Sequence, residues 1–324
     1  MKICIVGAGA IGATLGVGLA QSGQTVSVLA RGQTLAAVRA HGLGVVQGEQ
    51  TTRIKVAVSD QAAELGTQDL VVVAVKGPAM TAVAENIAPL LGSDTQVITA
   101  MNGLPWWFLD GLPHGMTDAV LRSVDPQGRL RALLPSRQVM GAVLHMACSQ
   151  VEPGLVRWNF GKGIILGHAL GGHSQSLDAA VAAFAKAGFD ASASACVQQD
   201  IWYKLWGNMT MNPVSAITGA TAYRMLGHPC VRAFCSAIMT EAAALGARIS
   251  CPIVQAPEER HAVTAKLGAF KTSMLQDVEQ GRTLEIDALL TVVLEIADRL
   301  GHPMPNASAL LGLVELMAES RGLR

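Results

Sequence analysis

The sequence has no excess of either charge and no long apolar run. Its 324 residues carry 24 basic and 24 acidic side chains, so the formal net charge is zero. A neutral chain offers no electrostatic attraction for nucleic acid or an anionic membrane. The apolar stretch from Leu70 to Val75 is followed at once by Lys76, and no run approaches the roughly 20 residues of a membrane-spanning helix. These absences favour small-molecule partners.

Patterns typical of metal sites and disulfides are also missing. The six cysteines include no C-x-x-C pair, and Cys4 falls within the first predicted strand, where a disulfide would be difficult to place. A reducing cytoplasm fits this pattern best. The eight histidines form no H-x-x-x-H motif and no mixed Cys/His cluster, so we expect no metal site.

The composition that remains is that of a folded enzyme. Hydrophobic residues make up 50% of the chain and charged residues 15%, which fits a soluble enzyme with sizeable buried cores. The length is sufficient for two domains. The sequence contains no internal repeat and no low-complexity segment.

The first 31 residues contain a glycine-rich turn between a strand and a helix. Residues 2–6 have the apolar, β-branched character of a buried parallel strand, and residues 7–12 read G-A-G-A-I-G, a G-x-G-x-x-G motif. The first glycine permits the tight turn, the second lets the backbone approach a pyrophosphate, and the third allows the helix to pack closely on the strand. The free amides at the helix start would hold the anion. The motif therefore predicts a Rossmann-type dinucleotide site formed by Gly7, Gly9, Ala10, Ile11 and Gly12.

Two other interpretations of this segment are weaker. Glycine-rich turns also serve plain packing, and Lys2 followed by a small apolar run to Ala20 has some features of a secretory signal. Three glycines interrupt that run, however, and the next strand, residues 25–29, begins at once. Cleavage there would remove the opening of the domain, so we favour the dinucleotide site.

Arg31 follows this second strand and bears on the choice of cofactor. A site specific for NAD usually places Asp or Glu here to bind the ribose 2′-hydroxyl, whereas an arginine pairs with a 2′-phosphate. No acidic residue occurs between Gln24 and Gln33. Arg31 therefore predicts NADP(H), and the alternative is a solvated surface arginine.

Lys76 and Asn102 each follow a further buried strand. Open α/β sheets bind ligands at the carboxyl ends of their strands, so both residues are candidates for a site. The other predicted elements are a hairpin over residues 45–58, strands over 69–75 and 96–101, a helix over 79–91, short strands over 139–145, 154–158 and 163–167, and a helix over 177–187.

The pattern changes to long helices from about residue 195 onward. We therefore expect an α/β protein with an N-terminal Rossmann-type dinucleotide-binding domain over residues 1–195 and a C-terminal all-α domain over residues 196–324. The first domain would contain a long loop over 104–137, and a loop of this length is more often a lid or binding loop than filler. Trp106 and Trp107 in this loop could wall a substrate pocket or cover the core.

Polar residues form a stripe on one predicted helix of the second domain. Lys204, Asn208 and Asn212 recur at every fourth residue and share one face. Their neighbours are largely apolar or aromatic, so the stripe either meets solvent or lines a cleft. Lys204 stands between two tryptophans and could simply extend along them to solvent.

A second polar group follows later in the chain. Ser273 and Asp277 are one helical turn apart, and Glu285 and Asp287 stand at the capped start of another helix. Carboxylates at a helix start are often partners of the helix dipole, and for Asp287 we favour that interpretation.

These residues together resemble the ketopantoate reductase (2-dehydropantoate 2-reductase) family. The motifs that carry the resemblance occur in order through nearly the whole chain. They are G-A-G-A-I-G at 7–12, the arginine at 31, V-K at 75–76, N-G at 102–103, Y-K-L-W-G-N at 203–208, N-P at 212–213, S-M-L-Q-D at 273–277 and L-E-I-D at 284–287.

The resemblance implies NADPH-dependent reduction of a 2-oxo acid to a 2-hydroxy acid. The expected reaction converts ketopantoate to pantoate, in pantothenate and coenzyme A biosynthesis. Lys204 would be the general acid, with Asn208 and Glu285 as its catalytic partners, while Arg31 and Lys76 would hold the 2′-phosphate. The residues expected around the substrate are Asn102, Asn208, Asn212 and Ser273, and Asn102 is also assigned to the cofactor.

The resemblance leaves several points open. Family members often have Q/H-N-G followed by a short connection, whereas Met101 precedes Asn102 here and the long loop follows it. Alternatives are a paralogous NADP-dependent 2-oxo/2-hydroxy acid oxidoreductase with another substrate, one that acts in the oxidative direction, or a non-catalytic NADP(H)-binding sensor. The polar residues of the second domain weigh against a sensor. A homodimer is also open, because apolar C-terminal helices over 288–300 and 309–317 could pack internally or across a dimer.

Overall fold

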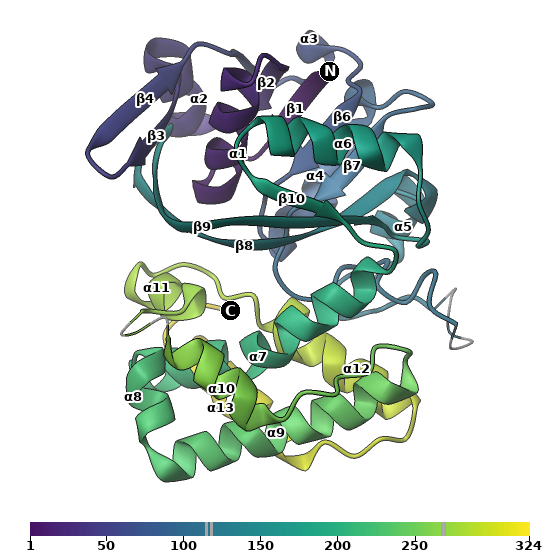
Figure 1. The fold of residues 1–324 in the computed structure, drawn as a ribbon, viewed down its shortest axis with the longest axis vertical. Helices are drawn as coiled ribbons and strands as arrows, with labels where there is room; N and C mark the ends of the chain where they lie inside the picture. The colour runs from purple at the N-terminus through teal and green to yellow at the C-terminus, as the bar shows by residue number, and fades with distance from the viewer. Residues whose placement is uncertain (114–115, 117–118, 267, 269) are drawn as a thin grey trace. The chain divides into compact units, whose positions relative to one another are not determined.

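The structure is a computed structural model and describes residues 1–113, 116, 119–266, 268 and 270–324. The chain forms two compact units (Figure 1). Unit 1 comprises Met1–Met101 and Arg129–Asp200, and unit 2 comprises Asn102–Gly128 and Ile201–Arg324. A mixed sheet with helices makes unit 1 and helices make unit 2, which confirms the predicted fold class.

Unit 1 is built on a ten-stranded sheet in the order β4-β3-β9-β8-β7-β6-β1-β2-β5, with β10 paired to β9. Its strands are β1 (Lys2–Val6), β2 (Thr25–Leu29), β3 (Leu43–Gln47), β4 (Gln50–Ile54), β5 (Ala57–Ser59), β6 (Leu70–Val73), β7 (Gln96–Thr99), β8 (Val139–Glu152), β9 (Leu155–His168) and β10 (Asp190–Ala193). Its helices are α1 (Ala10–Gln21), α2 (Gly32–His41), α3 (Ala62–Leu65), α4 (Met80–Asn86), α5 (Arg129–Leu133) and α6 (Gln175–Lys186), with short 3-10 turns at Gly77–Ala79, Ala88–Leu90 and Ser136–Gln138.

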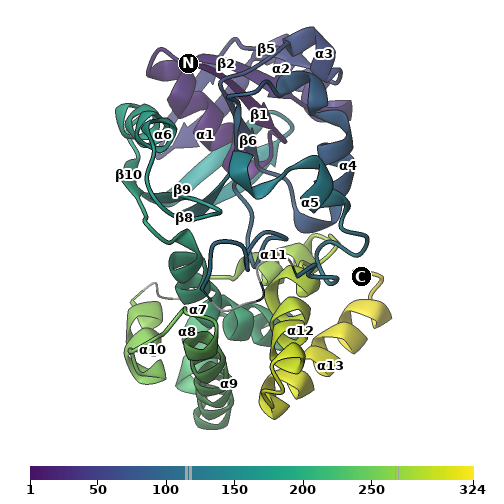
Figure 2. The same cartoon turned by 90° about the vertical axis from the view of Figure 1, so that its right-hand side faces the viewer.

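The centre of this sheet is parallel and buried on both faces. β1 lies between β2 and β6 and is parallel to both. α1 and α6 lie on one face, and α4 and α5 lie on the opposite face (Figure 2). Because both faces are covered, the strands need apolar residues at every position rather than in alternation, and Leu70–Val73 is buried throughout. Because β1, β2 and β6 are parallel, their carboxyl ends meet at one edge of the sheet.

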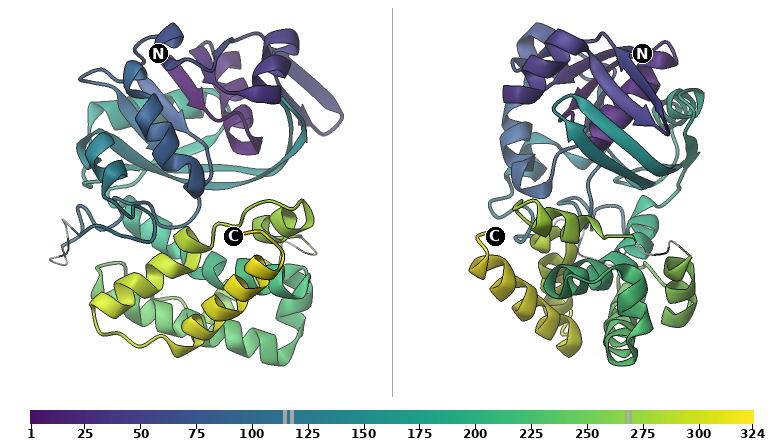
Figure 3. Two further views of the ribbon diagram at one scale, coloured as in Figure 1. Left: turned by 180° about the vertical axis from the view of Figure 1, so that it is seen from behind. Right: turned by 90° about the vertical axis from the view of Figure 1, so that its left-hand side faces the viewer.

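β8 and β9 form a long antiparallel pair that the sequence only partly predicts. Each strand has 14 residues, and the pairing contains register shifts between His145 and Ala147 and between Gln150 and Glu152. The pair is curved in Figure 3. The predicted short strands are the buried parts of these two strands. Their exposed parts were missed because polar residues and bulges interrupt the apolar pattern there.

Unit 2 is helical. Its helices are α7 (Val197–Thr218, whose first turn belongs to unit 1), α8 (Ala222–Gly227), α9 (Pro229–Arg248), α10 (Pro257–Ala265), α11 (Ser273–Glu279), a π-helical turn (Asp287–Thr291), α12 (Val292–Arg299) and α13 (Pro305–Ser320). α12 and α13 lie side by side in Figures 2 and 3. Trp202 and Trp206 of α7 are buried, and the indole of Trp206 donates to the carbonyl of Met239 on α9 at 2.7 Å. α7 is thereby fixed in the core of the unit.

Residues 102–128 differ from the expected division of the chain. They were expected in the first domain (1–195), but they cluster with the helical unit, and the later boundary falls between Asp200 and Ile201. The reason is burial: Trp106, Trp107 and Phe108 are at most 3% exposed, and the ring of Phe108 stacks on Trp202 at a centroid distance of 6.0 Å. The two tryptophans therefore cover the core. Four residues of the predicted 104–137 loop, 114, 115, 117 and 118, lie outside the described residues.

α9 is long and apolar enough, by length and composition alone, to cross a membrane, whereas the sequence predicted no such run. Its buried residues include Ile238, Met239, Ala242 and Leu245, and it packs on α8, α10 and α13. The carboxylate of Glu241 accepts hydrogen bonds from the backbone amides of Asn306 and Ala307 at the start of α13. In the apolar window of α9 33% of the residues are buried, and these contacts hold the helix against its neighbours in unit 2.

Glu295 of α12 fixes the 102–128 segment to unit 2. Its carboxylate accepts hydrogen bonds from the backbone amides of Arg122 and Ser123, both at 2.8 Å, and from the hydroxyl of Ser123 at 2.5 Å. Burial alone would raise the pKa of Glu295, but these hydrogen bonds and the charge of Arg299 lower it overall. The ionised carboxylate is therefore the form that holds the segment.

We expect Glu295→Ala to lower the free energy of unfolding by about 1–3 kcal/mol, because hydrogen bonds to a partly buried charge are lost. Urea denaturation at pH 7 measures this, with Glu319→Ala on exposed α13 as the control, expected within about 0.5 kcal/mol of the parent. Since the pKa of Glu295 is lower in the folded state, its contribution is present above the unfolded value and lost as the pH falls through the folded value. Equal stability of the two variants at pH 7 would contradict this role.

Candidate functional site

The glycine turn has the geometry that the motif predicts. Gly7 has φ of +90°, and a Cβ there would lie 2.6 Å from Cγ1 of Val75. A Cβ at Gly12 would lie 2.0 Å from the carbonyl oxygen of Gly7. α1 can therefore start directly against the turn only because both positions lack a side chain.

The start of α1 fits an anionic group. Gly9 is the N-cap residue, its side-chain position meets no atom within 4 Å, and no side chain caps the helix. The first turn contains Ala10 and Ile11 and no acidic residue. The first amides of a helix carry partial positive charge, and a backbone without a Cβ lets a phosphate come close to them. This donor set suits a pyrophosphate, as the sequence predicts.

Arg31 and Lys76 stand on either side of this turn. Arg31 is the N-cap of α2, two residues after β2, and Lys76 precedes the 3-10 turn after β6. In the register of the sheet, Val6 pairs with Leu29 on one side and Val73 on the other, so both cations lie at the same edge as the glycine turn. The Arg31 side chain is exposed and, within the described residues, makes no hydrogen bond or ion pair. Unit 1 therefore carries two cations beside the predicted pyrophosphate position.

The polar stripe on α7 contacts other predicted site residues within unit 2. Asn208 Nδ2 donates to Oδ1 of Asn102 at 3.4 Å, and Asn212 Nδ2 donates to Oγ of Ser273 at 3.5 Å. Both contacts are long, but they join segments that are 106 and 61 residues apart in the sequence. Asn102 was predicted to face both substrate and cofactor, and the structure places it in the helical unit.

Lys204 has a perturbed proton affinity. Burial lowers its pKa from 10.5 to about 8, and the charge of Glu285 opposes that decrease. A lysine with a pKa near 8 can both hold and release its proton close to neutral pH. Simple extension of the lysine to solvent does not account for such a shift.

The acidic residues of the second group differ in their surroundings. Asp277 is buried and forms an ion pair with Arg282 at 2.9 Å. Asp287 accepts a hydrogen bond from Arg324 at 2.9 Å and another from Thr291. Glu285 is the carboxylate whose charge acts on Lys204. Asp287 is thus bonded to Arg324 and Thr291, and Glu285 is the acidic residue whose charge acts on Lys204.

Arg260 is a neighbour of this stripe that the sequence analysis did not predict. Its guanidinium carbon lies 4.9 Å from the ring centre of Tyr203, and a Cβ at Gly207 would lie 3.2 Å from its Nε. The hydroxyl of Tyr203 donates to Gln255 at 2.6 Å. These contacts connect α10 with α7, and no local pattern marks residues that meet only in the folded chain. Among the described residues no group of three or more His, Cys, Asp or Glu side chains could hold a metal ion.

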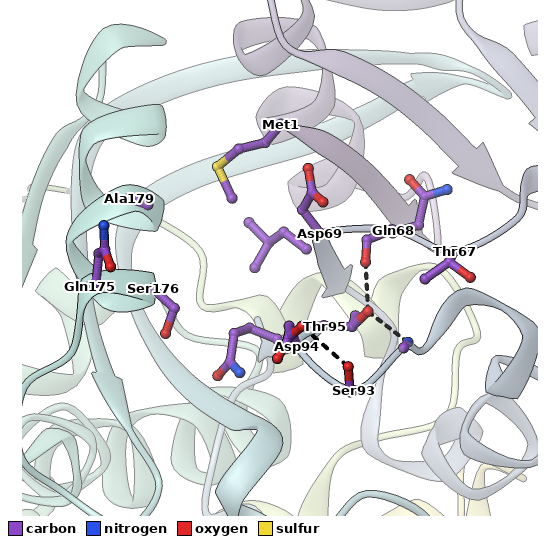
Figure 4. Close-up of a pocket in the computed structure, with 13 residues that line it drawn as sticks. Met1, Thr67, Gln68, Asp69, Ser93, Asp94, Thr95, Gln175, Ser176 and Ala179 are labelled. Atoms are coloured by element: carbon purple, nitrogen blue, oxygen red, sulfur yellow. Dashed lines mark hydrogen bonds between the residues drawn. The ribbon is translucent and has the colours of Figure 1, made fainter.

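A pocket in unit 1 lies at the wrong edge of the sheet for the dinucleotide. It has a volume of about 550 Å³ and is lined by residues at the amino ends of β1, β6 and β7 and by the first turns of α6. Figure 4 shows Asp69, Asp94 and Ser176 around it, and the hydroxyl of Thr95 donating to the carbonyl of Gln68. The glycine turn is at the carboxyl ends of the same strands. The pocket is therefore separate from the predicted cofactor site.

Comparison with known proteins relates both halves of the chain to one family. The family model for ketopantoate reductase PanE/ApbA matches residues 3–171, and its C-terminal model matches residues 196–318. The chain is 38% identical over 99% of both sequences to a 2-dehydropantoate 2-reductase from Mesorhizobium japonicum.

Solved structures agree with this assignment. A crystal structure from Ralstonia solanacearum, provisionally named as a ketopantoate reductase, is 51% identical with a TM-score of 0.96, and the match covers 100% of this chain and 99% of that one. D-mandelate dehydrogenase with NADH and anilino(oxo)acetate has a TM-score of 0.85 over 100% of both chains, and at 21% identity it shows the shared fold alone. The chain therefore belongs to the ketopantoate reductase (PanE/ApbA) family of NAD(P)-dependent oxidoreductases.

Proposed function

We propose that this protein reduces a 2-oxo acid to a 2-hydroxy acid with NADPH, and that its substrate is 2-dehydropantoate. The observation that carries the proposal is Lys204, whose pKa of about 8 results from burial opposed by the charge of Glu285. A non-catalytic sensor has no need of such a lysine in a helical unit that lacks the glycine turn. The 38% identical relative named 2-dehydropantoate 2-reductase supports the choice of substrate.

In the proposed reaction Lys204 supplies a proton. Bound NADPH provides the hydride that adds to C2 of the substrate. The ammonium of Lys204 donates its proton to the oxygen on C2 as negative charge develops there, and the lysine is left neutral. Glu285 favours the charged form of Lys204 before the transfer.

The amides and the hydroxyl of the site orient the substrate. Asn208 and Asn212 lie one and two turns beyond Lys204 on α7, where each can donate a hydrogen bond to a carboxylate or carbonyl oxygen. Ser273, which is bonded to Asn212, would anchor the carboxylate of the substrate. Asn102, which is bonded to Asn208, would be the remaining residue of the substrate site. Holding the reacting carbonyl in one orientation is worth several kcal/mol of barrier.

For the cofactor, we infer NADP(H) rather than NAD(H). Gly7, Gly9 and Gly12 with the amides of Ala10 and Ile11 would hold the pyrophosphate, and the exposed Arg31 with Lys76 would hold the 2′-phosphate. No carboxylate occurs on β2 or in the first turn of α2 to repel that phosphate.

We also propose a cytoplasmic location and a homodimer. All six cysteines are free, which suits a reducing compartment. α13 exposes Leu313 and Leu316, at 55% and 66%, on one face, and this apolar face would suit a second copy of the chain.

Lys204→Ala should lower kcat for 2-dehydropantoate reduction about a hundredfold to ten-thousandfold, because the general acid is lost. NADPH binding, followed by the fluorescence of the nicotinamide, should be unchanged. Lys266→Ala, an exposed lysine of the same unit, is the control and should keep parent activity. Full turnover by Lys204→Ala would remove this lysine from the mechanism, and inactivity of the parent with a panel of 2-oxo acids would favour the sensor.

The pH dependence of reduction tests the Lys204–Glu285 interaction. Since the protonated lysine is the active form, kcat/KM should fall as the pH rises through about 8. Glu285→Gln removes the charge that raises the pKa of Lys204, so the fall should begin at lower pH. Glu279→Gln on α11, paired with Lys271, should leave the profile in place. A profile that does not move, or moves to higher pH, in Glu285→Gln would contradict the interaction.

Arg31→Ala should raise KM for NADPH by roughly ten- to hundredfold, as expected for loss of a charged hydrogen bond. KM for NADH should change little, since NADH has no 2′-phosphate. Arg39→Ala, at the other end of α2, serves as the control. An equal change in KM for both cofactors would show that Arg31 does not contact the 2′-phosphate.

A further inference from the structure

The turn that carries Asn102 is joined to the helix that follows Glu285. The backbone amide of Leu104 donates to the carbonyl oxygen of Ala288 at 2.8 Å. Gly103, between Asn102 and Leu104, has φ of +78°. A Cβ on Gly103 would lie 2.2 Å from the carbonyl oxygen of Ala288 and 2.5 Å from its carbonyl carbon. The turn therefore sits directly on the backbone of Ala288, and only glycine allows this approach.

The helix that contains Ala288 has a π-helical turn where Leu104 binds it. Asp287–Thr291 is a π-helical turn, in which the amide of Val292 donates to the carbonyl of Asp287, one residue further back than in an α-helix. In an α-helix the same amide would bind the carbonyl of Ala288. The wider turn redirects that amide, and the carbonyl of Ala288 accepts from Leu104 instead. Turns of this kind are rare and occur often at functional sites.

The contact connects two residues of the proposed site. Asn102 immediately precedes Gly103, and its Oδ1 accepts from Asn208 on α7. Glu285 lies two residues before the π-turn, and its backbone carbonyl accepts from the amide of Leu289 within it. The hydrogen bond between Leu104 and Ala288 thus connects the segments that carry Asn102 and Glu285, which are far apart in the sequence.

We propose that Gly103, Leu104 and the π-turn at Ala288 form a positioning latch that holds the Asn102 amide in its catalytic orientation. The latch acts through Asn102 and has no contact with the reacting atoms of its own. It also assigns Asn102 to the substrate side of the reaction, although the residue follows β7 of the nucleotide-binding unit by only three positions. This inference rests on the proposed reductase function.

Gly103→Ala tests the latch, because its Cβ must displace the turn from Ala288. Displacement of a reacting group by about 1 Å can cost a hundredfold, so we expect kcat for 2-dehydropantoate to fall roughly tenfold to a hundredfold with NADPH binding unchanged. Gly301→Ala is the matched control: Gly301 has φ of +59° in the same unit, and a Cβ there meets no atom within 4 Å. It bears the same kind of backbone strain without the contact and should keep kcat within threefold of the parent, as a rough bound.

Two further variants separate positioning from general damage. If the latch acts through Asn102, adding Gly103→Ala to Asn102→Ala should lower kcat little beyond Asn102→Ala alone, whereas independent damage would multiply the two losses. Deletion of Thr291 should return the π-turn to a continuous α-helix and reproduce the loss of kcat. This deletion serves if Gly103→Ala fails to fold.

The outcomes distinguish the latch from the proposed function. Parent activity with 2-dehydropantoate together with equal kcat values for Gly103→Ala and Gly301→Ala would overturn the latch alone. Multiplicative losses in the double variant would also overturn it. An inactive parent would instead overturn the proposed function.

Discussion

The partly compensated burial of the Lys204 ammonium group is the constraint on which the proposed reaction depends. Removing a charged lysine from water is costly, and the chain meets that cost only in part, with one carboxylate at Glu285. The balance leaves the pKa at about 8, close to the range in which a proton donor works best at neutral pH.

The local parts of this arrangement could be predicted from the sequence. The G-A-G-A-I-G turn could be predicted because the adjacent residues also predict the strand before it and the helix after it. The contact of its Gly7 position with Val75 could not be predicted in this way. The stripe of Lys204, Asn208 and Asn212 follows from the helical repeat alone. The partners of the stripe came only from resemblance to a family, because Asn102 and Ser273 are 106 and 61 residues away from the side chains they meet.

Other features depend on contacts made only in the folded chain and could not be predicted from the local sequence. Arg260 reaches Tyr203 through the packing of α10 on its neighbours, and nothing in the sequence around either residue requires it. Residues 104–137 were expected to form a long loop because they are rich in turn-forming residues. Their aromatic side chains are buried in the helical core, and burial overrides local composition. The long strands β8 and β9 were seen only where both faces are apolar.

The division of the chain into two units separates two kinds of recognition. In the proposed function the glycines, helix amides and two cations of unit 1 would bind phosphate groups, and none of them would distinguish one 2-oxo acid from another. Unit 2 contains Lys204, Glu285 and the amide side chains of α7. It also contains Asn102, whose turn is bonded to Ala288 through the amide of Leu104. Under the proposed function, substitutions around α7, α11 and the π-turn would change which acid is bound and would leave the glycine turn as it is. Retention of one fold by enzymes with different 2-oxo acid substrates is the expected result of this separation, because the residues proposed to hold the pyrophosphate and the 2′-phosphate are not those proposed to select the substrate.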